Sequence, residues 1–223
     1  MKRSEINQAV EKAKRLFAEH QIALPFFAYV PRTRWADEVP AESLIKRLML
    51  GWDVTDFGSG DFSRVGSTLF TLRNGDINAP GVGSPYCEKL MVMDGCGQEI
   101  PMHYHVHKTE DIINRAGGTL AIQVYNALPD NSLDTEHDVV LWCDGVRRSF
   151  APGTVIRVTT GNSVTLTPSV YHRFYAEGGD TIAGEVSAVN DDTTDNVFLA
   201  PSARFTGIEE DEPAAHFLVT EYV

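Results

Sequence analysis

Two histidines and a glutamate with defined spacing are the strongest chemical feature of the chain. One residue separates His103 from His105, and four further residues lead to Glu110. Gly97 lies five intervening residues before this set, and Gly117 lies six intervening residues after it. Two imidazoles and a carboxylate can bind a divalent first-row metal ion and leave coordination positions open, as a catalytic ion requires. The spacing therefore predicts a metal-dependent activity.

The choice of histidines depends on how the chain turns. His103, His105 and His107 alternate with other residues, so all three could share one face of a strand. A site that also uses Glu110 needs the chain to turn back, and residues 106–109 provide that turn. We therefore expect His103 and His105 to be the ligands and Tyr104 to point away from them. A lone pair of alternating histidines is also typical of an exposed strand, but the additional spacing favours a metal site.

The pattern from Gly97 to Gly117 matches the first motif of the cupin superfamily without a gap. A later segment, Gly161–His172, resembles the second cupin motif, which has a proline and a glycine before a final histidine. Val170 stands where glycine is usual, Ala176 stands where asparagine is usual, and the spacing before the proline differs by one residue. The resemblance implies that His172 is the fourth metal ligand. The alternative is a histidine that packs at the start of a strand.

Composition is typical of one compact globular domain. The 223 residues fall in the range of single all-β barrels and sandwiches, and 43% of them are hydrophobic. The net charge is −12 and no basic patch contains interleaved aromatics, so we expect no nucleic-acid partner. The three cysteines form no CxxC pair, which favours reduced thiols. Without an apolar leader or a membrane-length run, we expect a cytoplasmic protein with no membrane contact.

Helical spacing is confined to the first part of the chain. Ser4 can cap a helix, because apolar residues recur at helical spacing after it: Ile6, Val10, Ala13, Leu16 and Phe17. A second short helix is expected from Pro40 to Leu50, ending at Gly51. We therefore expect residues 1–66 to form a helical extension that packs on a barrel of residues 67–223, within one structural domain.

From about Ser67, short apolar runs alternate with turn signals such as Asn74-Gly75 and Asp144-Gly145. Strands are expected at residues 69–72, 89–93, 119–125, 139–142, 155–159, 164–166, 172–176 and 181–186. This pattern predicts a mainly β sandwich or barrel. The cupin resemblance implies a jelly-roll barrel that brings the four expected ligands together.

The whole chain, including the helical preface and the segment Gly184–Asp192, resembles the D-lyxose ketol-isomerase family of bacterial cupins. The resemblance implies interconversion of D-lyxose with D-xylulose and of D-mannose with D-fructose. It also implies a divalent metal, usually manganese, with cobalt, iron or zinc as alternatives. A small-molecule sugar and a second copy of the chain in a homodimer are the implied partners.

Aldose–ketose conversion moves a proton between C1 and C2, so it needs a base besides the ion. Metal binding would withdraw basicity from Glu110. We prefer Glu185, because it lies in an apolar segment where burial would raise its proton affinity; exposure on the outer face is the alternative. An inward Lys89 could bind a sugar oxygen or balance charge, although an outward position is equally compatible. Glu88 and Lys89 have opposite parity, so a regular strand places only one inside.

The remaining acidic and aromatic residues are most simply explained by solvent exposure or by core packing. Runs of charge are usually solvated, although Asp191 or Glu209 could reach a sugar hydroxyl. Trp52, Phe174 and Tyr175 could support an apolar sugar face, with core packing as the alternative.

Two other classes of function fit the same ligand set. An iron- and oxygen-dependent dioxygenase would need oxygen, whereas an isomerase would turn over anaerobically. A sugar-binding module without catalysis would form no product. The fold does not decide among them.

Overall fold

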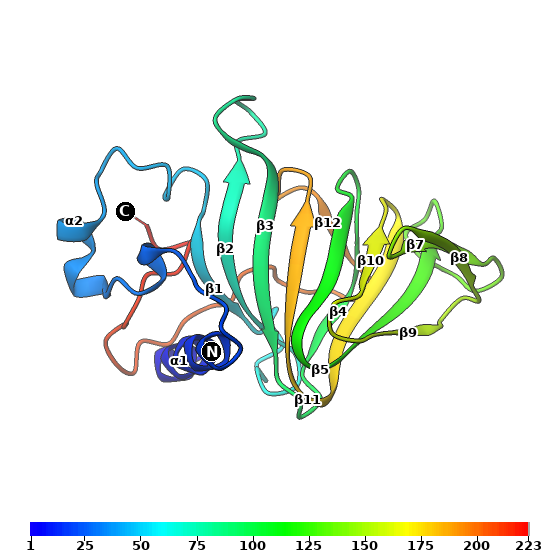
Figure 1. Cartoon of the computed structure of the whole chain (residues 1–223), viewed down its shortest axis with the longest axis horizontal. Helices are drawn as coiled ribbons and strands as arrows, with labels where there is room; N and C mark the ends of the chain where they lie inside the picture. The colour runs from blue at the N-terminus through cyan, green and yellow to red at the C-terminus, as the bar shows by residue number, and fades with distance from the viewer. Residues whose placement is uncertain (223) are drawn as a thin grey trace.

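The computed structural model describes residues 1–222, and it is mainly β (Figure 1). The helical elements come first: α1 (Arg3–Glu19), η1 (Phe26–Ala28), η2 (Arg32–Arg34) and α2 (Trp35–Glu38). The strands are β1 (Gly51–Thr55), β2 (Ser67–Gly75), β3 (Gly83–Met93), β4 (Glu99–His105), β5 (Glu110–Ala127), β6 (Leu133–Asp134), β7 (Val139–Cys143), β8 (Val146–Phe150), β9 (Val155–Val158), β10 (Ser163–Leu166), β11 (Val170–Ser187) and β12 (Asn196–Phe198). Within the described residues they form one twelve-stranded sheet, whose main path is β1-β2-β3-β11-β5-β10-β7-β8.

Two long strands, β5 and β11, organise this sheet. They pair with each other in antiparallel register from Val170↔Asn126 to Ser187↔Glu110. Along its other edge, β11 pairs with β4 in its first half and with β3 in its second half. β12 lies beside β4. The strands that carry the expected site residues are therefore direct neighbours, although they are far apart in the sequence.

The second glycine of the first motif allows the two long strands to pass very close to each other. The register of β5 with β11 shifts between Glu177 and Thr181, opposite Gly117. Gly117 has φ +89°, and a Cβ atom there would collide with the carbonyl oxygen of Asp180. Only glycine combines this backbone conformation with this close approach.

The sheet is buried on both faces in the region of β3. Leu90 and Val92 belong to the core that packs under α1, whereas Met91 and Met93 belong to the second core, inside the barrel. Figure 1 shows α1 beside β1 and both chain termini at this end of the molecule. Because side chains alternate along a strand, Lys89 shares the interior face with Met91.

Several expected elements differ from the structure. Residues 40–50 form turns rather than a helix, with Met49 at φ +52°, and the helical turn lies earlier, in α2. So short a segment gains little from helix formation, and burial of Ile45 and Leu48 decides its path. Lys2, not Ser4, is the N-cap of α1, and the Ser4 hydroxyl instead donates to Asp211.

The sheet also extends further than expected. β1 lies within residues 1–66 and pairs with β2 across the expected boundary, so the sheet begins at Gly51. The strands expected at 172–176 and 181–186 are one continuous strand, β11. The register of β11 against β5 shifts at the glycines between the two apolar runs, so the chain stays in the sheet there.

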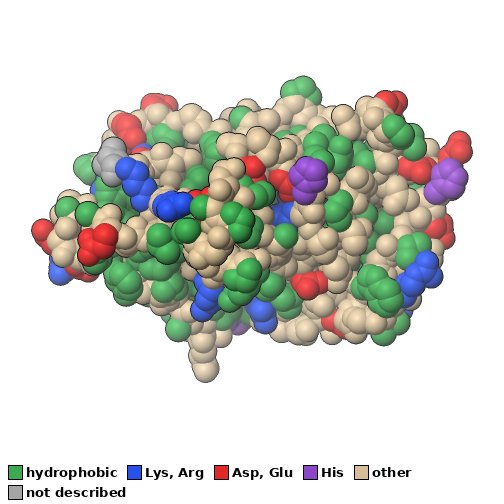
Figure 2. Space-filling model, turned by 90° about the horizontal axis from the view of Figure 1, so that it is seen from above, with side chains coloured by type: hydrophobic (Ala, Val, Ile, Leu, Met, Phe, Trp, Pro, Cys, Tyr) green, Lys and Arg blue, Asp and Glu red, His purple; other side chains and the backbone are tan. Residues whose placement is uncertain are grey.

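The surface shows no concentration of basic charge on the face drawn in Figure 2, where Lys and Arg side chains are scattered among acidic and apolar ones. Among residues 1–222, none of the helices has the length and apolar character needed to span a membrane.

Candidate metal and catalytic site

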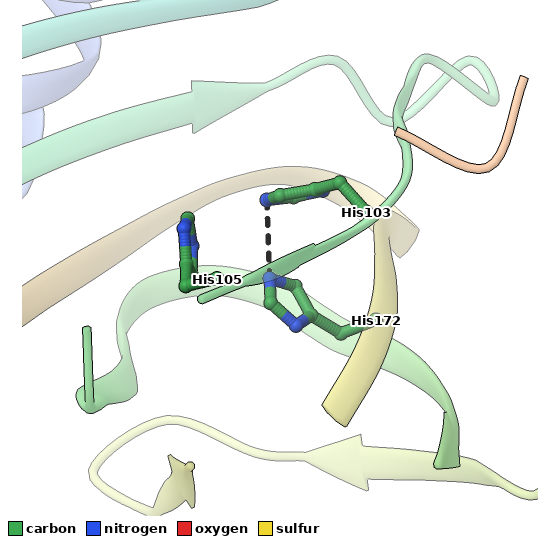
Figure 3. A group of neighbouring side chains, drawn as sticks. All are labelled: His103, His105 and His172. Carbon is green, nitrogen blue, oxygen red and sulfur yellow. Dashed lines mark hydrogen bonds between the residues drawn. The ribbon is translucent and has the colours of Figure 1, made fainter. Parts of the chain in front are cut away.

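Three histidines from two neighbouring strands point toward one another inside the barrel (Figure 3). β4 supplies His103 and His105, and β11 supplies His172, which is the register partner of His103. One ring nitrogen from each histidine lies within 4.8 Å of the other two. All three side chains are buried. His107 is exposed in the bend after β4 and lies outside this group.

Hydrogen bonds define which ring nitrogens carry hydrogen. Nδ1 of His103 lies 2.8 Å from the carbonyl oxygen of Pro101, and Nδ1 of His172 lies 2.9 Å from that of Val170. A carbonyl only accepts, so both Nδ1 atoms are donors. Burial lowers the pKa of His103 well below its ordinary value and that of His172 to about 4, so both rings are neutral at pH 7. Their Nε2 atoms therefore carry no hydrogen.

These two bare Nε2 atoms face each other at 3.1 Å, along the dashed line in Figure 3. Neither can donate to the other, so their lone pairs repel each other unless a cation lies nearby. Two nitrogens at ordinary bonding distance from one metal ion are themselves roughly 3 Å apart. The donor set fits a divalent ion.

Glu110 adds a carboxylate to the same place. Its Oε1 lies 3.2 Å from Nε2 of His172, and its Oε2 lies 3.3 Å from Nε2 of His105. Oε1 is buried and has no hydrogen-bond partner among the described residues. A buried carboxylate oxygen beside a bare imidazole nitrogen is a further unsatisfied acceptor, which a metal ion would satisfy.

A buried lysine links Glu110 to the second carboxylate of the site. Nζ of Lys108 lies 2.9 Å from Oε2 of Glu110 and 2.8 Å from Oε1 of Glu185. Burial lowers the pKa of Lys108, but the two carboxylates outweigh it and raise the net pKa, so the ammonium form persists. Sequence reasoning missed this residue. Lys108 lies in the turn between two expected strands, where strand periodicity does not decide the direction of a side chain, so no sequence signal marked it.

Glu185 lies inside the barrel with a side chain that is 5% exposed. Its Oε1 accepts hydrogen bonds from Lys108 and, at 3.1 Å, from the hydroxyl of Ser187. The expectation that burial raises its proton affinity is wrong in its net direction. Burial does raise the pKa of Glu185, but the ammonium groups of Lys108 and Lys89 outweigh burial and lower it. The group is a carboxylate at neutral pH.

Lys89 also lies inside, opposite Glu185 on the neighbouring strand. Its Nζ lies 3.4 Å from Oε1 of Glu185 and donates to Oδ1 of Asn190 at 2.7 Å. Burial lowers the pKa of Lys89, but the charge of Glu185 and then of Asp192 raises it overall. Glu88 turns outward and pairs with Arg73, in agreement with the opposite parity of the two positions.

A cavity of about 50 Å³ lies among these groups, and His103, His105, Lys108, Glu110, Lys89 and Glu185 line it. Its charged lining residues are joined by apolar ones, among them Phe57, Phe174 and Phe198. Of the three expected aromatics, Phe174 lines the cavity. Trp52 instead donates its indole N–H to Ala28 in the core under α1, and Tyr175 lies beside Arg173 on the other face of β11.

Asp191 and Glu209, the two acidic residues that could have reached a sugar hydroxyl, do not line the cavity. Asp191 accepts hydrogen bonds from Thr193 and Thr194 within its own loop, and Glu209 is exposed beside Lys2. Arg204, which sequence reasoning missed, lines the cavity and pairs with Asp53 and Asp192. No motif marks Arg204, because only the fold brings the C-terminal segment to this wall.

Comparisons with known proteins give one family over nearly the whole chain. A family model described as D-lyxose isomerase matches residues 1–222. The D-lyxose/D-mannose isomerase of Serratia proteamaculans is 44% identical over 227 residues, which cover 100% of this chain and 98% of that protein. The protein of the same name from Escherichia coli O157:H7 is 43% identical over 226 residues, with 100% and 98% covered.

Solved structures of L-ribose isomerases resemble the fold. The enzyme of Acinetobacter sp. DL28 in complex with L-ribose has a TM-score of 0.61 at 17% identity, with 94% of this chain and 98% of that chain covered. The Geodermatophilus obscurus enzyme has a TM-score of 0.59 at 17% identity, with the same coverage. The likeness confirms the expected mainly β cupin barrel with N-terminal helices.

Proposed function

Because the chain belongs to the D-lyxose isomerase family, we propose that it interconverts D-lyxose with D-xylulose and D-mannose with D-fructose. Membership makes it an aldose–ketose isomerase. The particular sugars are our proposal, which the names of the relatives from Serratia proteamaculans and Escherichia coli O157:H7 support.

The site would hold a divalent metal ion through His103, His105, Glu110 and His172, and manganese is the ion we propose. The observation that carries this proposal is the pair of hydrogen-free Nε2 atoms at 3.1 Å beside a buried, unpartnered carboxylate oxygen. When bound, such an ion supplies positive charge that stabilises a cis-enediolate of the sugar.

Glu185 would carry the proton. As a carboxylate it accepts the proton from C2 of the aldose, and as a carboxylic acid it returns that proton to C1, while the hydroxyl proton on the C2 oxygen moves to the C1 oxygen. The ketose reacts in the reverse order. Lys108 holds the side chain of Glu185 at 2.8 Å and keeps it ionised before the first transfer. The low net pKa limits the basicity of Glu185, so the step also requires a substrate proton made acidic by charge stabilisation nearby.

Lys89 would bind a sugar oxygen. Its ammonium group has three donor hydrogens. Asn190 accepts one at 2.7 Å, and Glu185 is a longer contact at 3.4 Å. A donor therefore remains for a hydroxyl in the cavity, while the positive charge offsets that of the neighbouring carboxylates.

The charges of the cavity favour a free sugar over a sugar phosphate. Lys89, Lys108 and Arg204 are the basic residues of its lining, apart from histidine, and each is already paired with a carboxylate. A phosphate group would have to compete with those carboxylates for its cation.

We also propose a cytoplasmic location and a homodimeric assembly. A cytoplasmic location is supported by the three thiols, of which none is in a disulfide among the described residues. A homodimer is implied by the family resemblance, and sedimentation velocity tests it.

Product analysis with D-lyxose and Mn²⁺ under anaerobic conditions tests the function. We expect D-xylulose to accumulate to an equilibrium mixture, and we expect D-lyxose and D-mannose to react faster than their C2 epimers. A requirement for oxygen would instead indicate a dioxygenase. Binding of D-lyxose without any product would indicate a sugar-binding module.

A further inference from the structure

One buried carboxylate outside the cavity lining faces the turn that carries Lys108. Asp195 lies in the loop between β11 and β12 and is 6% exposed. We propose that Asp195 is a positioning residue, which holds Lys108 and His105 in place for the reaction. The inference rests on the metal site and the isomerase activity proposed above.

Three consecutive backbone amides donate to this one residue. The N–H of Val106 donates to the carbonyl oxygen of Asp195 at 3.0 Å. The next two amides donate to its side chain: His107 to Oδ1 at 2.7 Å and Lys108 to Oδ2 at 3.2 Å. Residues 106–109 form no regular secondary structure, so these amides have no strand partner. Asp195 therefore accepts the backbone hydrogen bonds that a neighbouring strand would accept within a sheet.

The position of the turn decides where the Lys108 side chain lies. Its ammonium group must reach Glu110 and Glu185 at the same time, at 2.9 and 2.8 Å. The Lys108 amide is itself one of the two that the Asp195 side chain holds. A shift of this turn would lengthen both ion pairs and leave two buried carboxylates without their shared cation.

The environment of His105 is a second, independent reason to assign a positioning role to Asp195. The Nδ1 atoms of His103 and His172 are held by carbonyl oxygens on their own strands. Nδ1 of His105 is buried and has no hydrogen-bond partner among the described residues. The acidic group facing it is Asp195, whose Oδ2 lies 3.7 Å away, just beyond hydrogen-bond distance.

Asp195 thus occupies the place that a carboxylate takes behind many metal-binding histidines. A small closing movement would bring Nδ1 of His105 into hydrogen-bond contact with it and direct Nε2 toward Glu110. Asp195 itself does not line the cavity, so it would act through His105 and Lys108 rather than on the sugar.

The test compares Asp195→Ala and Asp195→Asn with Asp191→Ala in the full-length protein. Asp191 is a matched control, because its carboxylate accepts hydrogen bonds in the same loop but none from residues 106–108. Amide hydrogen exchange of residues 106–108 is measured without metal. Calorimetry with Mn²⁺ gives the dissociation constant, and steady-state kinetics with D-lyxose gives kcat and KM.

For Asp195→Ala we expect faster exchange at these amides, a roughly 10- to 100-fold weaker affinity for Mn²⁺, and a kcat that falls more than KM rises. Asp195→Asn keeps one acceptor oxygen and should fall between Asp195→Ala and the wild type. It serves as the test variant if the alanine variant does not fold. Asp191→Ala should match the wild type in all three measurements.

Unchanged Mn²⁺ affinity and kcat in both Asp195 variants would overturn the inference, even if exchange became faster. Equal losses in Asp191→Ala would also overturn it, since the loop as a whole would then be responsible. If the wild type itself failed to bind Mn²⁺ or to convert D-lyxose, the proposed function would fail instead. In that case unchanged exchange at residues 106–108 would reject the role of Asp195 separately.

Discussion

The ammonium group of Lys108 lies 2.8 Å from Oε1 of Glu185, and the same group lies 2.9 Å from Oε2 of Glu110. One buried cation is therefore shared by the carboxylate that we propose as a ligand and the carboxylate that we propose as the base. Burial alone would raise the pKa of both carboxylates, yet the net shift of both is downward. Both are thus ionised at neutral pH.

Removal of metal should abolish the isomerase activity. We expect a chelator to lower kcat by at least about 100-fold, because the ion supplies several kcal/mol of charge stabilisation, and Mn²⁺ should restore it. His172→Ala should lose Mn²⁺ binding in calorimetry. His107→Ala is the matched control, because its exposed ring lies outside the histidine group. Full activity after exhaustive chelation would reject the metal site.

The proton carrier can be tested by Glu185→Gln, which keeps the shape of the side chain. We expect kcat to fall by roughly 10²- to 10⁴-fold, the usual contribution of a general base, while Mn²⁺ affinity changes little. Exchange of the C2 hydrogen of D-lyxose with solvent deuterium should stop in parallel, as measured by NMR.

Glu88→Gln is the control for this experiment, since Glu88 is directed outward and pairs with Arg73. It should keep wild-type turnover. If Glu185→Gln retained both turnover and C2 exchange, another group would have to be the base.

Stability should depend on Lys108 in a pH-dependent way. Glu110 and Glu185 have pKa values lowered from an ordinary 4.5, so in the wild type they stabilise the fold above about pH 4.5. That stabilisation is lost as the pH falls through their lowered values. In Lys108→Met, burial is opposed by less positive charge, so the two pKa values rise.

We therefore expect Lys108→Met to cost about 3–5 kcal/mol at pH 7 in metal-free protein, and less near pH 4, where the carboxylates can take up protons. Urea unfolding at several pH values measures this. Lys12→Met is the control, because Lys12 pairs with Asp94 and Asp180 at the surface and should contribute no more than about 1 kcal/mol. A cost that did not vary with pH would contradict the shared-cation explanation.

Much of the fold followed from local patterns. Short apolar runs between turn signals predicted strands in β2, β3, β5, β7, β9, β10 and β11, because such runs are bounded where the chain turns. It did not predict that two of the expected strands join in β11, since only pairing with β5 carries the chain through Gly178 and Gly179. Residues 40–50 were predicted as a helix and form turns, since their path is set by the core they cover.

The sequence by itself determined which residues could bind a metal, because the spacing from Gly97 to Gly117 is local and includes two of the three clustered histidines and the neighbouring glutamate. Only the tertiary structure decided that Glu185 and Lys89 face inward, because strand periodicity leaves the choice of face open. The tertiary structure also places Lys108, Asp195 and Arg204 at the site. Their roles depend on charges from distant segments, and such contacts arise only when the barrel closes.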